Sequence, residues 1–339
     1  MRRSLVFLVT LMAACTMAVA QPRMVKMHRQ HSFDESVPAG NYSGITRVAD
    51  NDYAVVSDKA EDGFMLFTID IDRKTGNIKN VRLKQTLANQ SAGRDAEDIT
   101  FFAPAQTLFI SGESDNQALE YDMSGKRTGR KLKMPKAFTG AGNRYGAEAL
   151  TYNAKTHTFW ATTESTLKGD GRQAAADNHV KNKLRLQAFD EHLAPAGQYF
   201  YVMDAPVAKK KTNRYAMGCS ALTALDDGRL LVLEREFYVP GSKLGAFVNN
   251  KIYVVFPQKK DRVPTGTPWD EKKVIEKTLL CEWRTHLTLF EQSIANYEGM
   301  CLGPQLDNGD QVILLISDSQ NQYGGVLSDW FKTIVIHCE

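Results

Sequence analysis

The sequence lacks a large excess of positive or negative charge. It also lacks the short motifs that mark several large enzyme classes. Its 42 basic and 39 acidic residues leave a formal charge of +3, and the lysine run at 209–211 is too short to be the basic patch of a nucleic-acid-binding protein. It contains no Gly-x-Ser-x-Gly elbow and no P-loop. Its seven histidines show no HxH or HExxH spacing. We therefore expect no nucleic-acid partner and no histidine-based metal site.

Cysteine is also scarce, and none of the five cysteines lies in the CxxC spacing of a zinc site. If the chain is exported, Cys219, Cys281, Cys301 and Cys338 form an even set that allows three disulfide pairings. Buried free thiols are the alternative, and the sequence leaves both open.

No long apolar run occurs beyond the N-terminus. Residues 1–20 have the features of a secretion signal: Arg2 and Arg3, an apolar stretch at 5–14 and the small residues at 18–20. This stretch is too short to span a bilayer. The segment before Cys15 loosely resembles a lipoprotein cleavage box, so a lipid anchor there is the less favoured alternative. We expect an exported protein (periplasmic, outer-membrane-associated or extracellular) in which residues 21–339 form one domain.

One motif occurs five times. It consists of an acidic residue or serine, a small residue and an aliphatic residue, followed by a turn, an apolar strand and a second acidic residue. The copies run over residues 43–58, 97–113, 148–164, 220–234 and 298–318. A repeat of this period is typical of architectures built from one supersecondary unit.

Each copy predicts a β-hairpin followed by further strands. The turns at 226–228 and 307–309 have the Asp-Gly or Asn-Gly chemistry of tight hairpins, and short apolar runs such as 230–233 suit central strands covered on both faces. Four strands per repeat predict an all-β protein, a β-propeller of five four-stranded blades, with a degenerate sixth blade as the alternative. The outer strand of the second unit is expected at 131–134. The fifth unit lacks one strand, which the N-terminal segment 23–31 would supply to close the ring. A β-sandwich with a separate domain would not explain the repeat.

Hairpin geometry places both polar positions of each copy at the same end of its blade, because the first begins one strand and the second ends its antiparallel neighbour. The sequence therefore predicts a polar ring at one mouth of the central channel. Its members are Ser43, Asp58, Glu97, Asp98, Glu113, Glu148, Glu164, Ser220, Glu234, Glu298 and Asp318.

Arginines accompany these positions: Arg94, Arg144 and Arg214 lie just upstream of three copies, and Arg235 follows Glu234. Carboxylates alone would hold a hard cation such as calcium, whereas arginines suit a phosphate or carboxylate anion. Repeated carboxylates can instead be structural and tie neighbouring blades together through backbone N–H groups.

The repeated openings resemble a known family, as do the endings at 56–59, 162–165 and 316–322. This is the phytase-like family described as "esterase-like activity of phytase", found in exported bacterial proteins, and the similarity extends over about residues 41–335. The resemblance implies a phosphoesterase or phosphodiesterase activity carried by the recurring acids, which map onto Glu97, Glu148, Glu298 and the acids that end the second strands. Ser43 and Ser220 depart from the pattern.

From these observations we expect an exported hydrolase of small phosphate esters or related anions, assisted by calcium. The expected catalytic residues are Glu97, Asp98, Glu148 and Glu298. The expected substrate-binding residues are Arg94, Arg144, Arg214 and Arg235. The expected metal ligands are Asp58, Glu113, Glu164, Glu234 and Asp318. Two alternatives remain: a non-catalytic propeller that binds a ligand or partner at the cell envelope, and a lactonase or other carbohydrate-directed hydrolase.

Overall fold

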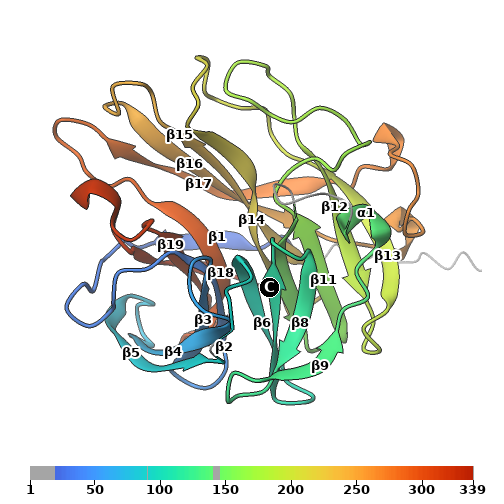
Figure 1. Cartoon of the computed structure of the whole chain (residues 1–339), viewed down its shortest axis with the longest axis horizontal. Helices are drawn as coiled ribbons and strands as arrows, with labels where there is room; N and C mark the ends of the chain where they lie inside the picture. The colour runs from blue at the N-terminus through green and yellow to red at the C-terminus, as the bar shows by residue number, and fades with distance from the viewer. Residues whose placement is uncertain (1–19, 90, 140–145, 339) are drawn as a thin grey trace, which may run out of the picture.

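The computed structural model describes residues 20–89, 91–139 and 146–338, which form five four-stranded antiparallel sheets arranged in a ring (Figure 1). The expected secretion signal and Cys15 lie outside the described residues, apart from Ala20. Within the described part of the chain, no helix is both long and apolar enough to cross a membrane.

Each blade is formed by four strands in sequence order, except the fifth. The first blade contains β2 (Tyr42–Arg47), β3 (Asp52–Ser57), β4 (Gly63–Ile71) and β5 (Ile78–Ala88). The second contains β6 (Ala96–Phe102), β7 (Thr107–Gly112), β8 (Gln117–Tyr121) and β9 (Arg127–Lys131). The third contains β10 (Ala147–Asn153), β11 (Thr158–Thr163), β12 (Lys183–Phe189) and β13 (Pro195–Val202). The fourth contains β14 (Tyr215–Ala224), β15 (Leu230–Tyr238), β16 (Ala246–Val255) and β17 (Lys277–Leu287).

The fifth blade confirms the predicted closure by the N-terminus. It contains β18 (Asn296–Gln305), β19 (Gln311–Asp318), β20 (Phe331–His337) and, outermost, β1 (Arg23–Met27). Strand β1 pairs antiparallel with β20, so that Arg23 lies opposite His337 and Met27 opposite Ile334. The two ends of the described chain therefore hold each other in one sheet, which closes the ring.

The helical elements are short. Over the described ranges they are α1 (Lys136–Thr139) and three 3₁₀ turns, η1 (Lys259–Asp261), η2 (Glu271–Lys273) and η3 (Tyr323–Gly325). The innermost strands β2, β6, β10, β14 and β18 each contact the next around the ring, and β18 contacts β2. The five-bladed β-propeller is thus confirmed.

The core lies between the blades. In β3, Tyr53 and Val55 pack against the fifth blade, whereas Ala54 and Val56 pack against the second. Alternate side chains of a strand point to opposite faces of its sheet. Because each blade packs between two neighbouring blades, both faces of its inner strands are covered and must be apolar. This is the physical reason for the short, continuous apolar runs in the sequence.

The outer strand of the second blade differs from its prediction. Strand β9 comprises Arg127–Lys131, and every residue in it is exposed. Leu132 lies beyond the strand and packs into the core between the second and third blades. An outermost strand faces water, so the apolar residues at 132 and 134 mark a connection that covers the core. The four cysteines in the described residues are free, and three of them are buried.

Candidate functional site

A β-bulge at the start of each inner strand creates the first layer of the site. In β10 the pairing with β11 moves from Ala147–Thr163 to Ala149–Thr162, so Glu148 has no partner of its own. The same shift occurs at the first motif position of the other four blades. A bulge inserts an extra residue and redirects its side chain. In three blades the bulge brings a glutamate to the channel mouth: Glu97, Glu148 and Glu298.

The serines at the bulges of the first and fourth blades hold the ring together instead. Ser43 Oγ donates to the carbonyl of Ala96 in the second blade over 2.5 Å. Ser220 Oγ donates to the carbonyl of Tyr297 in the fifth blade over 3.1 Å. Neither serine lines the pocket described below.

A second layer of the site comes from the second strand of each blade. It consists of the residue that directly follows the last cross-strand pair next to the bulge. This position is occupied by Asp58, Glu113, Glu164, Arg235 and Asp318, and all five line one pocket. The last pairs themselves include Tyr42–Ser57, Ala147–Thr163 and Cys219–Glu234. The fourth blade therefore contributes Arg235 where the other blades contribute a carboxylate.

Glu234, predicted as a metal ligand at the channel mouth, does not line this pocket. The next residue, Arg235, takes that position. The Glu234 carboxylate accepts hydrogen bonds from Tyr201 Oη at 2.5 Å and from the backbone N–H of Asp204 at 3.0 Å, and it pairs with Lys277 Nζ at 2.6 Å. These partners lie between the third and fourth blades, away from the mouth. A shift of one residue along a strand reverses the face to which the side chain points.

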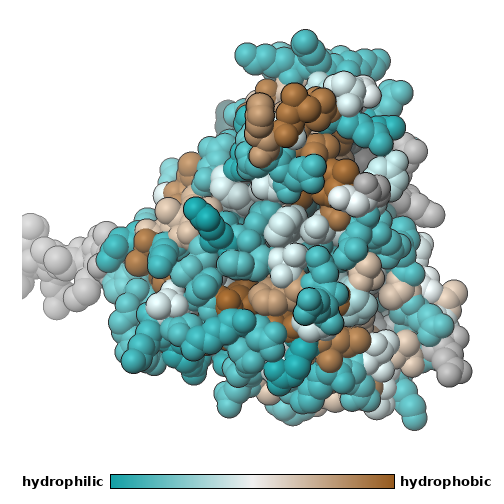
Figure 2. All heavy atoms as spheres, turned by 90° about the vertical axis from the view of Figure 1, so that its left-hand side faces the viewer, coloured by the Kyte–Doolittle hydropathy of each residue, from teal (hydrophilic) through white to brown (hydrophobic). Residues whose placement is uncertain are grey.

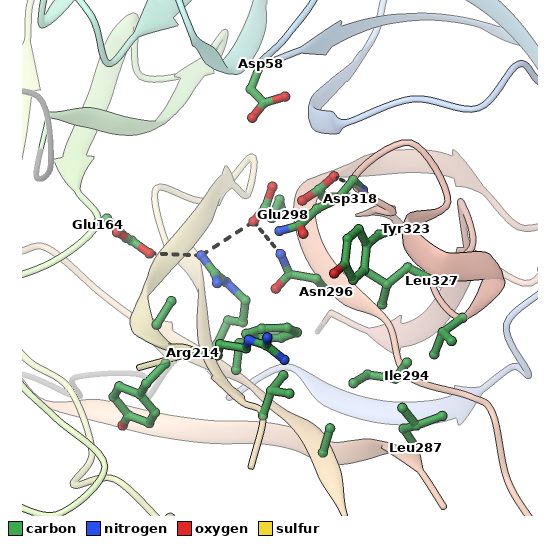
Figure 3. A pocket seen from close by; sticks show the side chains of 18 of the residues that line it. Asp58, Glu164, Arg214, Leu287, Ile294, Asn296, Glu298, Asp318, Tyr323 and Leu327 are labelled. Atoms are coloured by element: carbon green, nitrogen blue, oxygen red, sulfur yellow. Dashed lines mark hydrogen bonds and ion pairs between the residues drawn. The ribbon is translucent and has the colours of Figure 1, made fainter. Parts of the chain in front are cut away.

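The pocket at the mouth has a volume of about 650 Å³, within the range of ligand sites in proteins. Figure 3 shows Asp58, Glu164, Glu298 and Asp318 on one side of it and Leu287, Ile294 and Leu327 on the other, with Tyr323 beside Asp318. Its carboxylates are Asp58, Glu97, Glu113, Glu148, Glu164, Glu298 and Asp318. We refer to these seven as the carboxylate ring.

Arg235 is the cation at the centre of the carboxylate ring. Its Nη2 lies 2.9 Å from an oxygen of Glu164 and 3.6 Å from one of Glu298. The side chain is almost completely buried, and its Nε has no hydrogen-bond partner among the described residues. Together with Lys59, which pairs with Asp58 at 2.8 Å, Arg235 supplies two positive charges beside seven carboxylates.

Burial and mutual repulsion raise the pKa of the ring acids. Desolvation, followed by the charges of neighbouring carboxylates, raises the pKa of Glu97, Glu148 and Glu298 well above the usual glutamate range. The same causes raise the pKa of Glu113 to about 7, and burial raises that of Asp318 to about 6. Glu148 is only 7% exposed, and its carboxylate accepts no hydrogen bond from the described residues. These groups are held ready for a proton, a cation or a ligand.

Two members of the ring, together with the neighbouring Asp95, have the donors for a cation. Asp95, Glu97 and Glu113 each offer a carboxylate oxygen, and the three oxygens lie within 4.8 Å of one another. Lys59 Nζ borders this cluster, 2.8 Å from oxygens of both Asp95 and Asp58. Oxygen-only donors suit calcium or magnesium. Asp95 was not among the predicted residues, because it lies before the motif, opposite Glu113 at the end of the hairpin.

Two of the four predicted arginines lie at the pocket. Arg235 is inside it, and Arg214 is an exposed lining residue whose guanidinium forms no ion pair within the described chain. Arg144 lies outside the described residues.

Arg94 does not reach the pocket, so its predicted role as an anion clamp is corrected. Its Nε and Nη2 each donate to Asp115 over 2.8 Å, and Nη1 donates to Tyr121 Oη over 3.2 Å. Arg94 is buried. Its guanidinium is thus committed to structure within the second blade.

Asp98 is also structural rather than a member of the pocket. One carboxylate oxygen accepts from the backbone N–H of Ile99 and the other from that of Leu150 in the third blade, both over 2.8 Å. Asp98 is 1% exposed, and burial raises its pKa. It lies next to Glu97 within the bulge and points the opposite way.

We expect Asp98→Ala to lower the free energy of unfolding by about 2–3 kcal/mol, because two buried N–H groups lose their acceptor. Urea denaturation monitored by circular dichroism would measure this. Asp226→Ala is the matched control, since Asp226 is an exposed turn aspartate with no hydrogen bond to the described residues. Equal losses for the two variants would contradict the structural role of Asp98.

At the opposite mouth of the channel, the described residues that line the cavity include no carboxylate. This cavity of about 170 Å³ is lined by side chains that include Thr46, Thr100, Thr151 and Thr223. These threonines bond from blade to blade: Thr46 Oγ1 accepts from Phe101 N–H, and Thr100 Oγ1 from Tyr152 N–H. The acids and the hairpin turns therefore lie at opposite ends, as the hairpin argument predicts.

A large apolar part of the pocket was not predicted. It is formed by Phe237, Val239, Ala246, Leu287, Ile294, Val326 and Leu327. Tyr215, Tyr323 and Lys243 also line the pocket. These residues come from strand ends and connections of the fourth and fifth blades, where no repeated pattern singles them out.

The chain resembles known proteins in two ways. A family model described as "Phytase-like: Esterase-like activity of phytase" matches residues 37–320. None of the curated proteins compared with the chain matches it.

Among solved structures, a streptogramin B lyase is similar with a TM-score of 0.39 and 12% identity, over 91% of this chain and 97% of that one. A duf4221 family member from Bacteroides vulgatus has a TM-score of 0.41 and 10% identity, over 94% and 99%. A nidogen/laminin complex has a TM-score of 0.40 and 10% identity, over 86% and 83%. Similarities this low carry no information about activity.

Proposed function

The chain belongs to the phytase-like family described as "esterase-like activity of phytase", and from this premise we propose that it is an exported, calcium-assisted hydrolase of phosphate esters. Its site is the pocket bounded by the carboxylate ring. Membership of the family supports this class of reaction, and the geometry of the pocket supports the choice of residues.

The observation that carries this proposal is the convergence of Glu97, Glu148 and Glu298 from three blades. All three carboxyl groups are held at the channel mouth with raised pKa values. Glu298 accepts from Asn296 Nδ2 at 2.7 Å and lies near Arg235, but burying several acids with so few partners costs free energy, and perturbed acids in a cleft are typical of functional sites. Asp98 and Arg94, by contrast, have hydrogen-bond partners that account for their burial, so their role is structural.

The residues fit a hard cation. Asp95, Glu97 and Glu113 would hold calcium, since their oxygens already converge and calcium takes carboxylate ligands from flexible sites. When bound, the ion would neutralise phosphate charge and polarise the P–O bond.

Glu148 is the candidate general acid–base. A raised pKa brings a glutamate towards neutral pH, where proton transfer by a side chain is most effective. Its carboxylate is free of hydrogen bonds within the described chain, so it is available to take a proton from water or to protonate the leaving oxygen. Arg235, fixed by Glu164 and Glu298, adds a permanent positive charge beside it. Arg214 at the rim has a free guanidinium that suits a phosphate oxygen.

We expect the purified protein to hydrolyse members of a phosphomonoester and phosphodiester panel with calcium present, and to lose this activity with a chelator. Glu148→Gln should lower kcat/KM by about 100-fold or more, because the amide cannot transfer the proton. The thermal midpoint should stay at or above that of the wild type, since one buried charge is removed. Glu191→Gln, at an exposed glutamate outside the pocket, is the control and should retain full activity.

Absence of turnover with every ester would overturn the proposal. The favoured alternative would then be a non-catalytic binding propeller at the cell envelope, for which the large, partly apolar pocket is the supporting observation. Ligand-induced thermal stabilisation without chemistry would identify it.

A further inference from the structure

One side of the pocket is not used by the proposed chemistry. We call this side the apolar wall and define it as Phe237, Val239, Ala246, Leu287, Ile294, Val326 and Leu327. Figure 3 shows Leu287, Ile294 and Leu327 grouped together, across the pocket from Asp58 and Glu164. The wall and the carboxylate ring therefore face the same space of about 650 Å³.

The apolar wall is built on a packed core. Val239, Ala246, Ile294 and Leu327 are buried in a cluster of their own at the ends of the fourth and fifth blades. Phe237, Leu287 and Val326 pack against this cluster and remain partly exposed. A wall whose side chains already pack against one another is formed before a ligand arrives, which reduces the cost of binding.

Exposed apolar side chains lie next to the wall in sequence. Leu244 is 47% exposed, Leu289 is 79% exposed and Phe290 is 99% exposed. Leu244 precedes Ala246 by two residues, and Leu289 and Phe290 follow Leu287 directly after Thr288. Figure 2 shows the face of the molecule that carries these connections, with an apolar patch near its top. Large apolar side chains that stay exposed beside a pocket-lining segment are a feature of binding regions.

The charges around the pocket exclude a ligand with many negative groups. The seven carboxylates of the ring share the pocket with three basic residues, Arg235, Arg214 and Lys243, and Lys59 pairs with Asp58 from outside it. Arg235 is already paired with two glutamates, and Lys243 Nζ lies 5.4 Å from the centroid of the Tyr323 ring at the rim. A cation in the ring would compensate one phosphate group, whereas further phosphates would meet the excess of carboxylates over basic residues in the pocket.

We propose that the substrate is a phosphate ester of an apolar alcohol, an alkyl or aryl phosphate, with its phosphate at the carboxylate ring and its organic group against the apolar wall. The placement of the phosphate rests on the proposed function. In the reaction the bond between phosphorus and the alcohol oxygen breaks, and a water oxygen becomes bonded to phosphorus. One water proton ends on the alcohol, so the products are the free alcohol and inorganic phosphate. A highly phosphorylated polyol is a poor fit to the same pocket.

Alkylphosphonates test this proposal without turnover, because their C–P bond is not hydrolysed by such a reaction. Calorimetry in the presence of calcium should show octylphosphonate binding at least about tenfold more tightly than methylphosphonate, since each buried methylene contributes about fourfold. Leu287→Ala and Val326→Asp should bring this ratio towards one. Val25→Asp is the matched control, since Val25 is an exposed valine on the outer strand β1, and it should keep the wild-type ratio.

Hydrolysis of methyl and octyl phosphate, assayed in parallel, separates the two proposals. A preference for octylphosphonate without hydrolysis of either ester would support the apolar ligand and overturn the proposed function. Hydrolysis with equal kcat/KM for both esters and equal phosphonate affinities would support the function and overturn the apolar substrate. Binding of neither phosphonate would overturn the inference, as would wall variants that keep the wild-type ratio.

Discussion

Replacing Arg235 with methionine should lower the free energy of unfolding at pH 7.5 by about 3–5 kcal/mol, the usual cost of removing one partner from a buried ion pair. Arg235 is the only cation near the centre of the carboxylate ring in the described structure, and its loss leaves Glu164 and Glu298 unpaired. At pH 5 the deficit should be smaller, because the acids around the vacated position can take up protons. Urea denaturation at both pH values would measure the two losses.

Arg214→Met is the matched control for this experiment. Arg214 lines the same pocket, but it is exposed and has no ion pair within the described chain. We expect its replacement to change the free energy of unfolding by no more than about 0.5 kcal/mol. An Arg235→Met loss that is equally large at pH 5 and 7.5 would show that packing, not charge compensation, is the role of Arg235.

Without calcium, the stability of the protein should fall as the pH rises from about 4.5 to 7. Glu113 has a pKa of about 7 in the folded protein against an ordinary value of 4.5, and Asp318 shifts in the same direction, from 3.8 to about 6. The folded state therefore keeps protons that the unfolded chain has released, so stability decreases with pH in this window. Glu113 alone should account for roughly 2 kcal/mol once its partial exposure is allowed for.

Saturating calcium should reverse this loss. An ion that binds only the folded state at 100 times its Kd adds about 2.7 kcal/mol, and the effect should be larger at pH 7.5 than at pH 5. Glu97→Gln should greatly reduce the stabilisation, because it removes one of the three converging donors. Glu61→Gln, at an exposed glutamate outside the pocket, should leave it intact. Stability that rises with pH in calcium-free buffer would contradict the raised pKa values.

The architecture could be predicted because every blade must meet the same requirement, namely that its inner strands are buried on both faces. A strand between two blades is covered on both faces, which requires runs such as Tyr53–Val56 to be apolar throughout. The motif acids could be placed at one mouth because antiparallel pairing puts the start of one strand beside the end of the next. The origin of the missing strand of the fifth unit could be predicted because the ring has to close. Arg23–Met27 supplies this strand.

The errors in the site arise from single-residue details of the backbone. The motif treats Glu234 as the second acid of the fourth blade, but the pairing of Cys219 with Glu234 leaves the mouth position to Arg235. Glu97 and Asp98 are adjacent in a bulge, and only the pairing shows that one lines the pocket while the other bonds to Leu150 N–H. A sequence pattern shows that a polar residue is present, whereas the register decides where it points.

The apolar wall could not be predicted at all. Phe237 and Leu287 lie at the ends of β15 and β17, whose pattern of apolar and polar residues gives no sign of a cavity. Val326 and Leu327 lie in an irregular connection between β19 and β20. They meet only because the fourth and fifth blades are neighbours in the ring. No local signal in the sequence reports such a meeting.

Calcium titration by calorimetry, in two buffers that differ in ionisation enthalpy, tests the central claim most directly. If the carboxylate ring is a cation site made of acids with raised pKa values, calcium should bind saturably at pH 7 and displace protons from the ring, since carboxylates must be ionised to act as ligands. The apparent enthalpy should then differ between the buffers, and Glu97→Gln should lose both the binding and the difference. Saturable binding that releases no protons and survives Glu97→Gln, or the absence of binding, would contradict the account.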